Sequence, residues 1–315
     1  TSNQQPMTNL IIGVDGGQTS TKCVLVDDRM NVLGYGAGGE LRHLVAHGGR
    51  ERHVSALRAC IAQAFAQAGL PIQPVAAIGL GLSGVSGPES PLAEMAREYM
   101  PDVIDAKVVV VESDAYTALL GAHGGKPGAI AIAGTGSNAM GINAAGQVKR
   151  AGGWGWLLGD EGSAMRIGHD GLVAALQYWD RIGEPTTMLK AFQTHFNAIN
   201  MRLIVASVYS ADFWAKGFAT LAEVVSRCAT DGDAIARNVI EQNGAELARQ
   251  VDAVVRQLAH PSPLPVSPMG GAFEHVFGLR AAFDGALVRL GSPCVVTPPQ
   301  APPMFGAAIL ANLSR

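Results

Sequence analysis

The chain of 315 residues is 48% hydrophobic and 16% charged, which gives it enough apolar side chains to bury the cores of two domains. Its formal net charge of −3, with both signs interspersed, offers neither a basic stripe for nucleic acid nor a polybasic helix for a membrane. The four cysteines are far apart and form no Cys-x-x-Cys pair, which argues against a zinc site or a disulfide framework. They are Cys23, Cys60, Cys228 and Cys294.

Such cysteines fit a reducing compartment. No apolar run approaches the roughly 18 residues of a membrane span, and residues 1–9 lack the charged and apolar regions of a signal peptide. The sequence therefore predicts a cytoplasmic protein that has no nucleic-acid or membrane partner.

Three predicted strands joined by tight turns open the chain. The apolar run 10–14 predicts a buried strand, the glycine turn 15–20 leads to a second strand over 22–27, and a polar turn leads to a third over 32–36. The same order of strands and turns recurs over residues 129–151. This recurrence predicts an internal duplication with two like domains, although two glycine-rich hairpins can also resemble each other by chance.

The remaining elements follow from apolar spacing. Residues 51–68 predict a helix with one apolar face, and a strand over 75–80, a helix over 90–100 and a strand before Asp114 complete a βββαβαβ order. The second half is mostly helical, and residues 205–209 fit either a strand or a helix. Predicted helices there cover 161–178, 185–195, 217–229, 233–259, 274–290 and 304–313, with strands over 265–268 and 294–297.

Two acids follow predicted strands, where open α/β sheets place their chemistry. Asp15 stands where a carboxylate can hold Mg²⁺ or its waters beside phosphates, or it merely caps its own turn. Asp114 can accept a proton from a substrate hydroxyl, or it caps the helix that follows; both roles can hold at once.

Glycine turns follow strands in both copies of the meander. Their backbone N–H groups can point at a shared anion, and Thr19 and Thr135 add hydroxyl donors, so the pair predicts a clamp for a polyphosphate. Either turn alone is more simply read as a hairpin. The P-loop and Rossmann patterns are both absent from the sequence. A strand, a double glycine and a helix over residues 269–290 indicate another backbone that a ligand approaches closely.

Together these segments resemble the successive motifs of the N-acetylglucosamine kinase family, the BadF/BadG/BcrA/BcrD ATPase-like branch of the actin, Hsp70 and sugar kinase superfamily. The motifs occur in order and span nearly the whole chain. They are Asp15–Thr19, Ser113–Ala115, Gly134–Asn138, Gly152–Gly162 and Met269–Phe273. We call residues 152–162 the glycine–tryptophan segment, because it holds five glycines and two tryptophans.

The resemblance implies an α/β fold with two ribonuclease H-like (actin-like ATPase) domains and a cleft between them. The N-terminal domain would cover residues 1–120 and be completed by the C-terminal helix 304–315. The C-terminal domain would cover residues 121–303 and carry helical insertions.

The resemblance also implies roles for single residues. Gly16, Gly17 and Thr19 would form the first phosphate loop, Thr135 and Gly136 the second, and Gly270 with Gly271 the adenosine loop. Asp114 would be the catalytic base, while Asn138, Gly153, Trp154 and Asp160 would line the sugar. For Asp160 the alternative is that it begins the helix predicted from Glu161, where acids suit the positive end of the dipole.

Two departures from the family pattern stand out. Gln18 replaces a third glycine in the first phosphate loop. Where relatives that bind N-acetylglucosamine often carry an asparagine-containing segment, this chain has Gly39-Glu40-Leu41-Arg42-His43. Recognition of the sugar's 2-substituent, and any sugar contact by Arg42 and His43, therefore stay undecided.

The sequence thus predicts an ATP-dependent kinase that uses Mg²⁺ and phosphorylates an amino sugar, N-acetylglucosamine or glucosamine, on its 6-hydroxyl. One alternative is an ATPase activator of the 2-hydroxyacyl-CoA dehydratase type, which needs cysteines at a dimer interface to hold an iron–sulfur cluster. The other is a sugar-sensing module that has lost turnover. The sequence is compatible with a homodimer.

Overall fold

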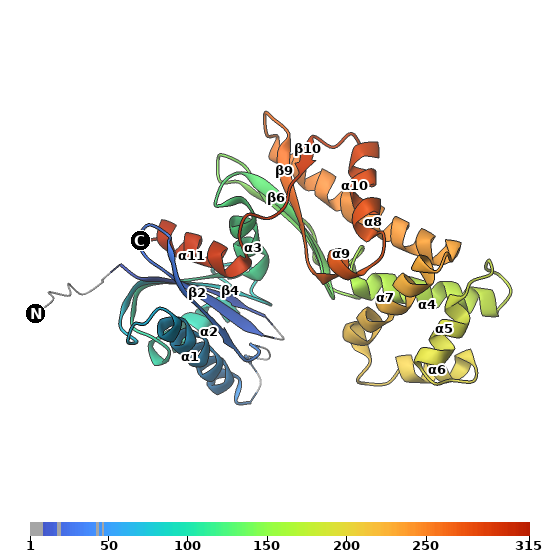
Figure 1. Ribbon diagram of the computed structural model, residues 1–315, viewed down its shortest axis with the longest axis horizontal. Coiled ribbons are helices and arrows are strands. Elements are labelled where there is room, and N and C mark those ends of the chain that lie inside the picture. Colours follow the sequence, from blue (N-terminus) through green and yellow to red (C-terminus); the bar gives the residue numbers. More distant parts are fainter. Residues whose placement is uncertain (1–8, 18–19, 42–43, 46) are drawn as a thin grey trace, which may run out of the picture. The chain divides into compact units, whose positions relative to one another are not determined.

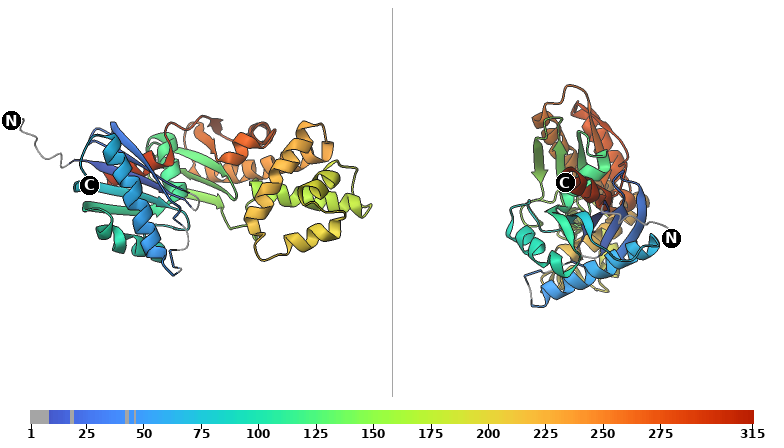
Figure 2. Two further views of the ribbon diagram at one scale, coloured as in Figure 1. Left: turned by 60° about the horizontal axis from the view of Figure 1, so that its bottom comes forward. Right: turned by 90° about the vertical axis from the view of Figure 1, so that its left-hand side faces the viewer.

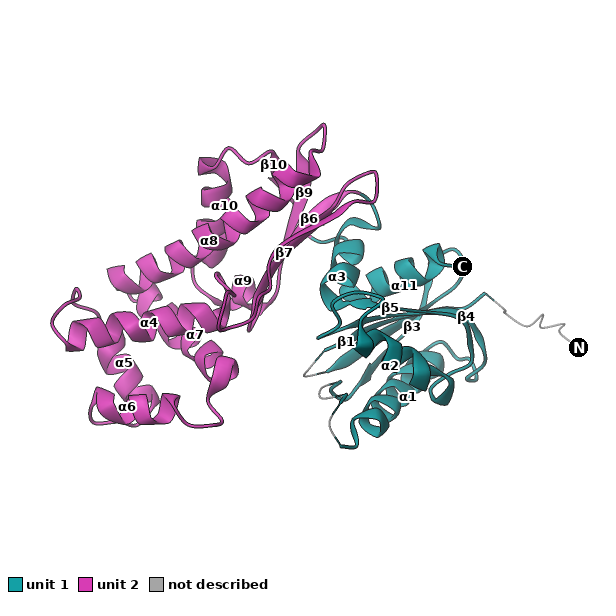
Figure 3. Ribbon diagram, turned by 180° about the vertical axis from the view of Figure 1, so that it is seen from behind, with its two compact units in different colours: residues 1–126, 299–315 teal, residues 127–298 magenta. Residues whose placement is uncertain are grey.

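A computed structural model describes residues 9–17, 20–41, 44–45 and 47–315 and divides the chain into two compact units (Figure 3). Unit 1 comprises residues 1–126 and 299–315, and unit 2 comprises residues 127–298. The units therefore meet after residues 126 and 298, while the predicted boundaries lie after residues 120 and 303. Each unit contains one five-stranded sheet.

Unit 1 follows the predicted βββαβαβ order and is closed by the last helix of the chain (Figure 1). Its sheet has the order β3-β2-β1-β4-β5; the first three strands form an antiparallel meander, and β4 and β5 run parallel to β1. Its elements are β1 (Ile11–Gly16), β2 (Thr21–Val26), β3 (Val32–Gly38), α1 (Gly49–Gln67), β4 (Val75–Leu82), α2 (Pro91–Tyr99), η1 (Met100–Asp102), β5 (Ala106–Ser113), α3 (Asp114–His123) and α11 (Pro303–Leu313).

Helices cover both faces of this sheet. Helices α1 and α2 lie on one face and α3 and α11 on the other (Figure 3), with α1 running along the strands (Figure 2). Helix α1 packs with its predicted apolar face inward, since the side chains of Leu57, Ile61 and Phe65 are almost fully buried. The parallel strands end together at one edge, which is where the predicted acids of this unit lie.

Unit 2 repeats the sheet and adds helices (Figure 1). Its sheet has the order β10-β9-β6-β7-β8, with β6, β7 and β8 antiparallel and β9 parallel to β6. Its elements are β6 (Gly128–Ala133), β7 (Ser137–Ile142), β8 (Val148–Gly152), α4 (Ala164–Trp179), α5 (Met188–His195), α6 (Met201–Val208), α7 (Trp214–Thr230), α8 (Ala234–Leu258), β9 (Leu264–Met269), α9 (Gly271–His275), α10 (Leu279–Arg289) and β10 (Cys294–Val296).

The two sheets have the same topology. If the strands of each unit are numbered in chain order, both sheets have the spatial order 3-2-1-4-5. The corresponding strand pairs are also parallel or antiparallel in the same way. The predicted duplication is thus present in the fold. This repeated order is the one expected of two ribonuclease H-like, actin-like domains, so the predicted fold class is confirmed.

Two predicted elements differ in the structure, and one that the sequence left open is decided. The helix expected from Glu161 begins at Ala164, because Gly162 takes a left-handed φ of 84° and Ser163 caps the helix by accepting from Arg166 N at 3.1 Å. The helix expected over 274–290 is divided into two: α9 ends at His275, and α10 begins after Gly278, which takes a left-handed φ of 75°. Residues 205–208 are helical, as the end of α6.

Within the described part of the chain, no helix combines the length and the apolarity that a bilayer crossing requires.

Candidate functional site

In unit 1 the candidate polar side chains lie at the carboxyl ends of β1, β4 and β5. Asp114 is the first residue of α3, directly after β5, and both of its carboxylate oxygens are held. Ser83, which follows β4, donates from Oγ to Asp114 Oδ2 at 2.5 Å, and Ala115 N donates to Oδ1 at 2.8 Å. The cap of α3 is Ser113, which accepts from Tyr116 N at 3.2 Å, so the interpretation of Asp114 as the N-cap is wrong.

Asp15 lies inside β1, opposite Lys22 of β2, rather than in the turn. Burial raises the pKa of its carboxyl from 3.8 to about 6, repulsion from Asp114 adds to the rise, and Lys22 opposes it. Two carboxylates therefore share one neighbourhood in which a cation would relieve their repulsion. Among the residues described, no three histidine, cysteine or acidic side chains gather as a ready metal site. Mg²⁺ suits such a place, because it is commonly held by one or two carboxylates together with phosphates and water.

The first glycine turn is only partly described. A Cβ added at Gly16 would lie 2.5 Å from Leu82 Cδ2 and 2.7 Å from Leu41 Cδ1, so a larger residue there would displace these two leucine side chains. Gly17 N donates to Ser20 O at 3.0 Å, which closes the turn on itself. The predicted donor Thr19 lies outside the described residues, as do Arg42 and His43.

The second glycine turn, between β6 and β7, lies against the carboxylate of Asp160. Ser137 N donates to Asp160 Oδ1 at 3.2 Å, and a Cβ added at Gly136 would lie 2.9 Å from Oδ2. The start of α4 braces the same turn, since Met165 N donates to the carbonyl of Thr135 at 3.3 Å. Thr135, Gly136 and Asp160 are therefore neighbours in unit 2, although they are distant in sequence.

Asp160 is 8% exposed and takes a left-handed φ of 62°. Its pKa is raised, chiefly by burial and further by the nearby Glu161, while the Ser137 N–H lowers it. Because the cap of α4 is Ser163, Asp160 does not begin the helix, and that alternative is wrong. A buried carboxylate with free acceptor capacity beside the turn between β6 and β7 suits a ligand that carries hydroxyl donors.

The other predicted sugar residues lie beside this carboxylate in sequence and structure. Asn138, on β7, has a buried Oδ1 without a hydrogen-bond partner, and a Cβ added at Gly153 would lie 3.3 Å from Asn138 Cγ. Trp154 is 68% exposed, and the Arg150 guanidinium lies 5.9 Å from its ring centroid. Trp154 thus offers an open aromatic face, and Asn138 offers an unused acceptor.

The third glycine-containing motif is the pair Gly270 and Gly271, which follows β9. Gly270 takes a φ of 102°, and a side chain there would collide with the backbone of Ala133 at the end of β6. Gly271 is the first residue of the short helix α9. The close backbone approach predicted at this pair is therefore at least partly an approach by the chain's own strand.

Sequence reasoning missed three polar residues that contact the predicted site. Ser83 falls in a small-residue loop at a strand end, which is the signal that could have found it. Asn243 and Gln250 contact the glycine–tryptophan segment from α8, a helix that the sequence analysis treats as scaffold. Their signal is two amides at positions that share the buried face of an amphipathic helix.

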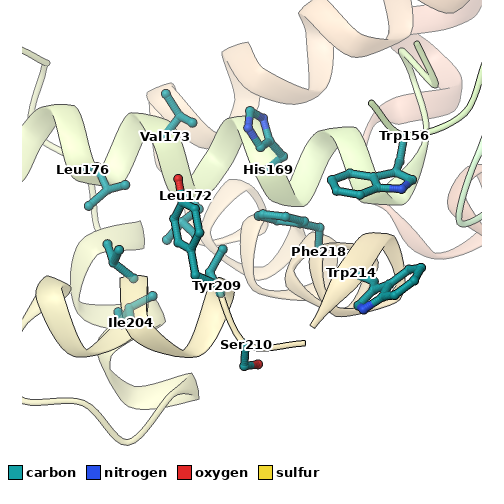
Figure 4. A pocket seen from close by; sticks show the side chains of 12 residues that line it. Trp156, His169, Leu172, Val173, Leu176, Ile204, Tyr209, Ser210, Trp214 and Phe218 are labelled. Atoms are coloured by element: carbon teal, nitrogen blue, oxygen red, sulfur yellow. The ribbon is translucent and has the colours of Figure 1, made fainter. Parts of the chain in front are cut away.

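A cavity of about 500 Å³ lies among α4, α6 and α7 of unit 2 (Figure 4). Trp156 and Trp214 lie at one end and Leu176 at the other. Its wall is mostly aliphatic and aromatic, so it offers little to replace the water around a polyphosphate and is poorly suited to the phosphates of a nucleotide. None of the predicted site residues lines it; Trp156 is its one contact with the glycine–tryptophan segment.

Comparison with known proteins places these features in a family context. The model of the BadF/BadG/BcrA/BcrD ATPase family matches residues 12–311. The chain is 29% identical over 310 residues to an N-acetylmuramic acid/N-acetylglucosamine kinase of Clostridium acetobutylicum, which covers 96% of this chain and 98% of that protein. It is 27% identical over 300 residues to the glucosamine kinase GspK of Vibrio cholerae, covering 90% of this chain and 97% of that protein.

A solved structure agrees with the sequence matches. A candidate N-acetylglucosamine kinase from Chromobacterium violaceum superposes with a TM-score of 0.75 at 29% identity, covering 97% of this chain and 99% of that one. Similarity thus extends over both units rather than over one of them.

Proposed function

Because the chain belongs to the BadF/BadG/BcrA/BcrD ATPase family, we propose that it is an ATP-dependent kinase of an amino sugar, N-acetylglucosamine or glucosamine, acting on the 6-hydroxyl. Relatives named as kinases of these sugars match it over nearly their whole length. The observation that carries the proposal is the pair of acids, Asp15 and Asp114, at the ends of parallel strands in unit 1. We assign units 1 and 2 to the two domains of this kinase architecture.

Asp114 is the catalytic base in this proposal. Its Oδ2 is held by Ser83 and its Oδ1 by Ala115 N, so the carboxylate is oriented before the sugar arrives. A carboxylate held in this way accepts the proton of the attacking hydroxyl as the bond to the γ-phosphorus forms. The catalytic gain comes mainly from positioning, because phosphoryl transfer needs little covalent help from the protein.

Asp15 is the residue that would hold Mg²⁺, whose charge neutralises the phosphates when it is bound. Burial is the main cause of the raised pKa of Asp15, and repulsion from Asp114 adds to it. This repulsion supports the assignment, because a bound cation would relieve it. The phosphate loops are formed by Gly16, Gly17 and Thr19 and by Thr135 and Gly136, and the adenosine loop by Gly270 and Gly271.

The sugar is bound in this proposal by Asp160, Asn138, Gly153 and Trp154 of unit 2. The carboxylate of Asp160 can accept protons from two neighbouring hydroxyls, and the buried Oδ1 of Asn138 can accept another. A site built on such bonds rejects analogues that lack the hydroxyls much more strongly than an apolar pocket does.

The two alternatives make different demands. A dehydratase activator would need accessible cysteines to hold a cluster between two chains, but Cys23, Cys60 and Cys228 are buried and Cys294 is only partly exposed. This burial favours the kinase. A sugar sensor would keep the ligand contacts of unit 2 without turnover, and only an activity measurement separates it from a kinase.

The test is ATP consumption measured with N-acetylglucosamine, glucosamine, N-acetylmuramic acid and glucose, with the product identified by mass and by the position of its phosphate. We expect turnover with at least one of the first two sugars, phosphate on the 6-hydroxyl, and dependence on Mg²⁺. Sugar binding without ATP consumption would support the sensor instead.

We also place the reaction in the cytoplasm, where ATP is supplied and the four free thiols stay reduced. The homodimer stays a prediction, which light scattering on the purified chain tests.

A further inference from the structure

Helix α8 holds the glycine–tryptophan segment from one side. Positions 243, 247 and 250 are spaced four and three residues apart, so they lie on one face of the helix. The residues at all three positions contact the glycine–tryptophan segment, at Gly152, Glu161 or Gly162. The contacts come from two amides with an apolar residue between them.

Asn243 anchors the end of the segment. It is 3% exposed, and its Oδ1 accepts from Gly162 N at 3.0 Å. Its Nδ2 donates to Asp170 Oδ2 and to Val239 O, both at 3.0 Å, so the amide is satisfied on both sides and joins the segment to α4 and α8. A Cβ added at Gly162 would lie 2.6 Å from Leu247 Cβ, so the segment fits closely on the helix at this point.

Gln250 contacts the segment near its end and at its beginning. Its Nε2 donates to Glu161 Oε2 at 3.1 Å, and a side chain at Gly152 would collide with its Oε1. Glu161 is held from the other side as well, because its carbonyl accepts from Ser137 Oγ at 2.7 Å. Asp160 therefore directly precedes Glu161, which α8 holds, and its own carboxylate contacts the turn between β6 and β7.

We propose that Asn243 and Gln250 are positioning residues that hold the glycine–tryptophan segment so that Asp160 faces the sugar. This inference rests on the proposed sugar role of Asp160. Neither amide needs to touch the sugar; they act through Gly162 and Glu161. A displacement of a binding group by about 1 Å can cost on the order of a hundredfold in rate, so the anchors have a measurable consequence.

The main test is Gln250→Glu, which keeps the shape of the side chain but sets a second carboxylate against Glu161. At pH 8 the two charges repel and the anchor is lost; at about pH 5 a proton shared by the pair restores a donor. We expect a sugar KM on the order of tenfold above wild type at pH 8, approaching the wild-type value near pH 5. The KM for ATP should stay within about twofold.

Two further variants complete the design. Gln250→Ala should raise the sugar KM at both pH values, because it has no group that a proton could restore. Gln257→Glu places the same new charge on an exposed position of α8 and should change neither KM. The other charged groups near these contacts are Asp160 beside Glu161, Asp170 with its partners Arg166 and His169, and Glu246 paired with Arg249. They are present in every variant and cancel in the comparison.

A second readout does not depend on activity. Amide hydrogen exchange of peptides covering residues 152–163, measured without sugar, should be faster in Asn243→Ala and Gln250→Ala than in wild type and in Gln257→Glu. Since Asn243→Ala leaves a buried N–H without an acceptor and can prevent folding, Gln250→Ala decides the outcome if only one variant folds.

The outcomes separate this inference from the proposed function. If the wild type phosphorylates no amino sugar, the proposed function fails, and hydrogen exchange alone then decides whether α8 anchors the segment. If the wild type is active but Gln250→Glu and Gln250→Ala keep its sugar KM at pH 8, the positioning role is overturned. Unchanged exchange in the folded variants would overturn it as well.

Discussion

The two units share one sheet topology but supply their acids in different ways. In unit 1 the acids belong to the sheet itself: Asp15 lies in β1 and Asp114 directly follows β5. In unit 2 the fifth position of β6 is Ile132, and the acid Asp160 instead comes from the segment after β8. The duplicated backbone therefore provides the same edge twice, but the acids near that edge come from different positions in the two units.

One polar feature is shared by both units. Thr21 and Ser137 are the buried first residues of the second strand, and both hydroxyls hold the chain that follows the third strand. Thr21 Oγ1 donates to Gly39 O at 2.6 Å, and Ser137 Oγ donates to Glu161 O at 2.7 Å. This hydrogen bond of the scaffold is thus common to the two units, while the acids near the sheet edge differ.

The largest expected effect concerns the acid carried by the sheet of unit 1. Asp114→Asn should lower kcat by roughly 10²–10⁴, the usual contribution of a positioned base, and leave the fold and ATP binding intact. Asp105→Asn is the matched control, because Asp105 is exposed and lies at the opposite end of β5. Wild-type turnover in Asp114→Asn would show that Asp114 is not the catalytic base.

The acid of unit 2 should affect binding rather than the chemical step. Asp160→Ala should raise the sugar KM by about 10- to 100-fold, because hydroxyl donors of the sugar lose a charged acceptor. The affinity for ATP, measured by calorimetry, should stay close to that of the wild type. Asp180→Ala, at an exposed acid that ends α4, serves as the control. An unaltered sugar KM would exclude Asp160 from the sugar site.

Asp15 should show a trade between stability and activity. Its folded-state pKa of about 6 lies above 3.8, so the native state binds the proton more tightly and stability falls as pH rises between these values. Asp15→Asn removes the buried charge and should raise the free energy of unfolding at pH 7.5 by roughly 1–3 kcal/mol, while turnover falls. The gain in Tm should disappear near pH 4. A lower Tm at pH 7.5 would contradict this explanation.

The smallest effects test the shared hydroxyls. Thr21→Val and Ser137→Ala should each cost about 1 kcal/mol of stability, the usual net value of one hydrogen bond. Only Ser137→Ala should also raise the sugar KM, by a few fold, because it loosens the segment that carries Asp160. Thermal unfolding and steady-state kinetics on both variants check this. A raised sugar KM in Thr21→Val would instead bring residues 39–43 into the sugar site.

Local patterns predicted most of the sheet. The apolar runs ended by glycine turns gave β1, β2, β6 and β7, because strand burial and turn chemistry are both written in neighbouring residues. The role of Ser83 could not be predicted in this way, since its partner Asp114 is brought to it by the parallel pairing of β4 with β5.

The helical part of unit 2 was less predictable for the same reason. The start of α4 depends on Gly162, whose left-handed conformation is supported by contacts from α8 that are distant in sequence. Asn243 and Gln250 look like ordinary helix residues until the segment lies against them. Tertiary contacts, rather than local propensity, define this part of the candidate site.

Unit 1 is built from two separate stretches of the chain, and this affects the order in which the units fold during synthesis. Helix α11 packs on Gly13 of β1 and Gly79 of β4 so closely that any side chain at either glycine would collide with its backbone. This helix leaves the ribosome only after all of unit 2, which is continuous over residues 127–298. During synthesis the apolar face that includes Ile11, Val24 and Ala77 therefore waits without its cover. We expect the later-made unit to finish folding first and the earlier-made unit to finish last, which reverses the usual N-to-C order.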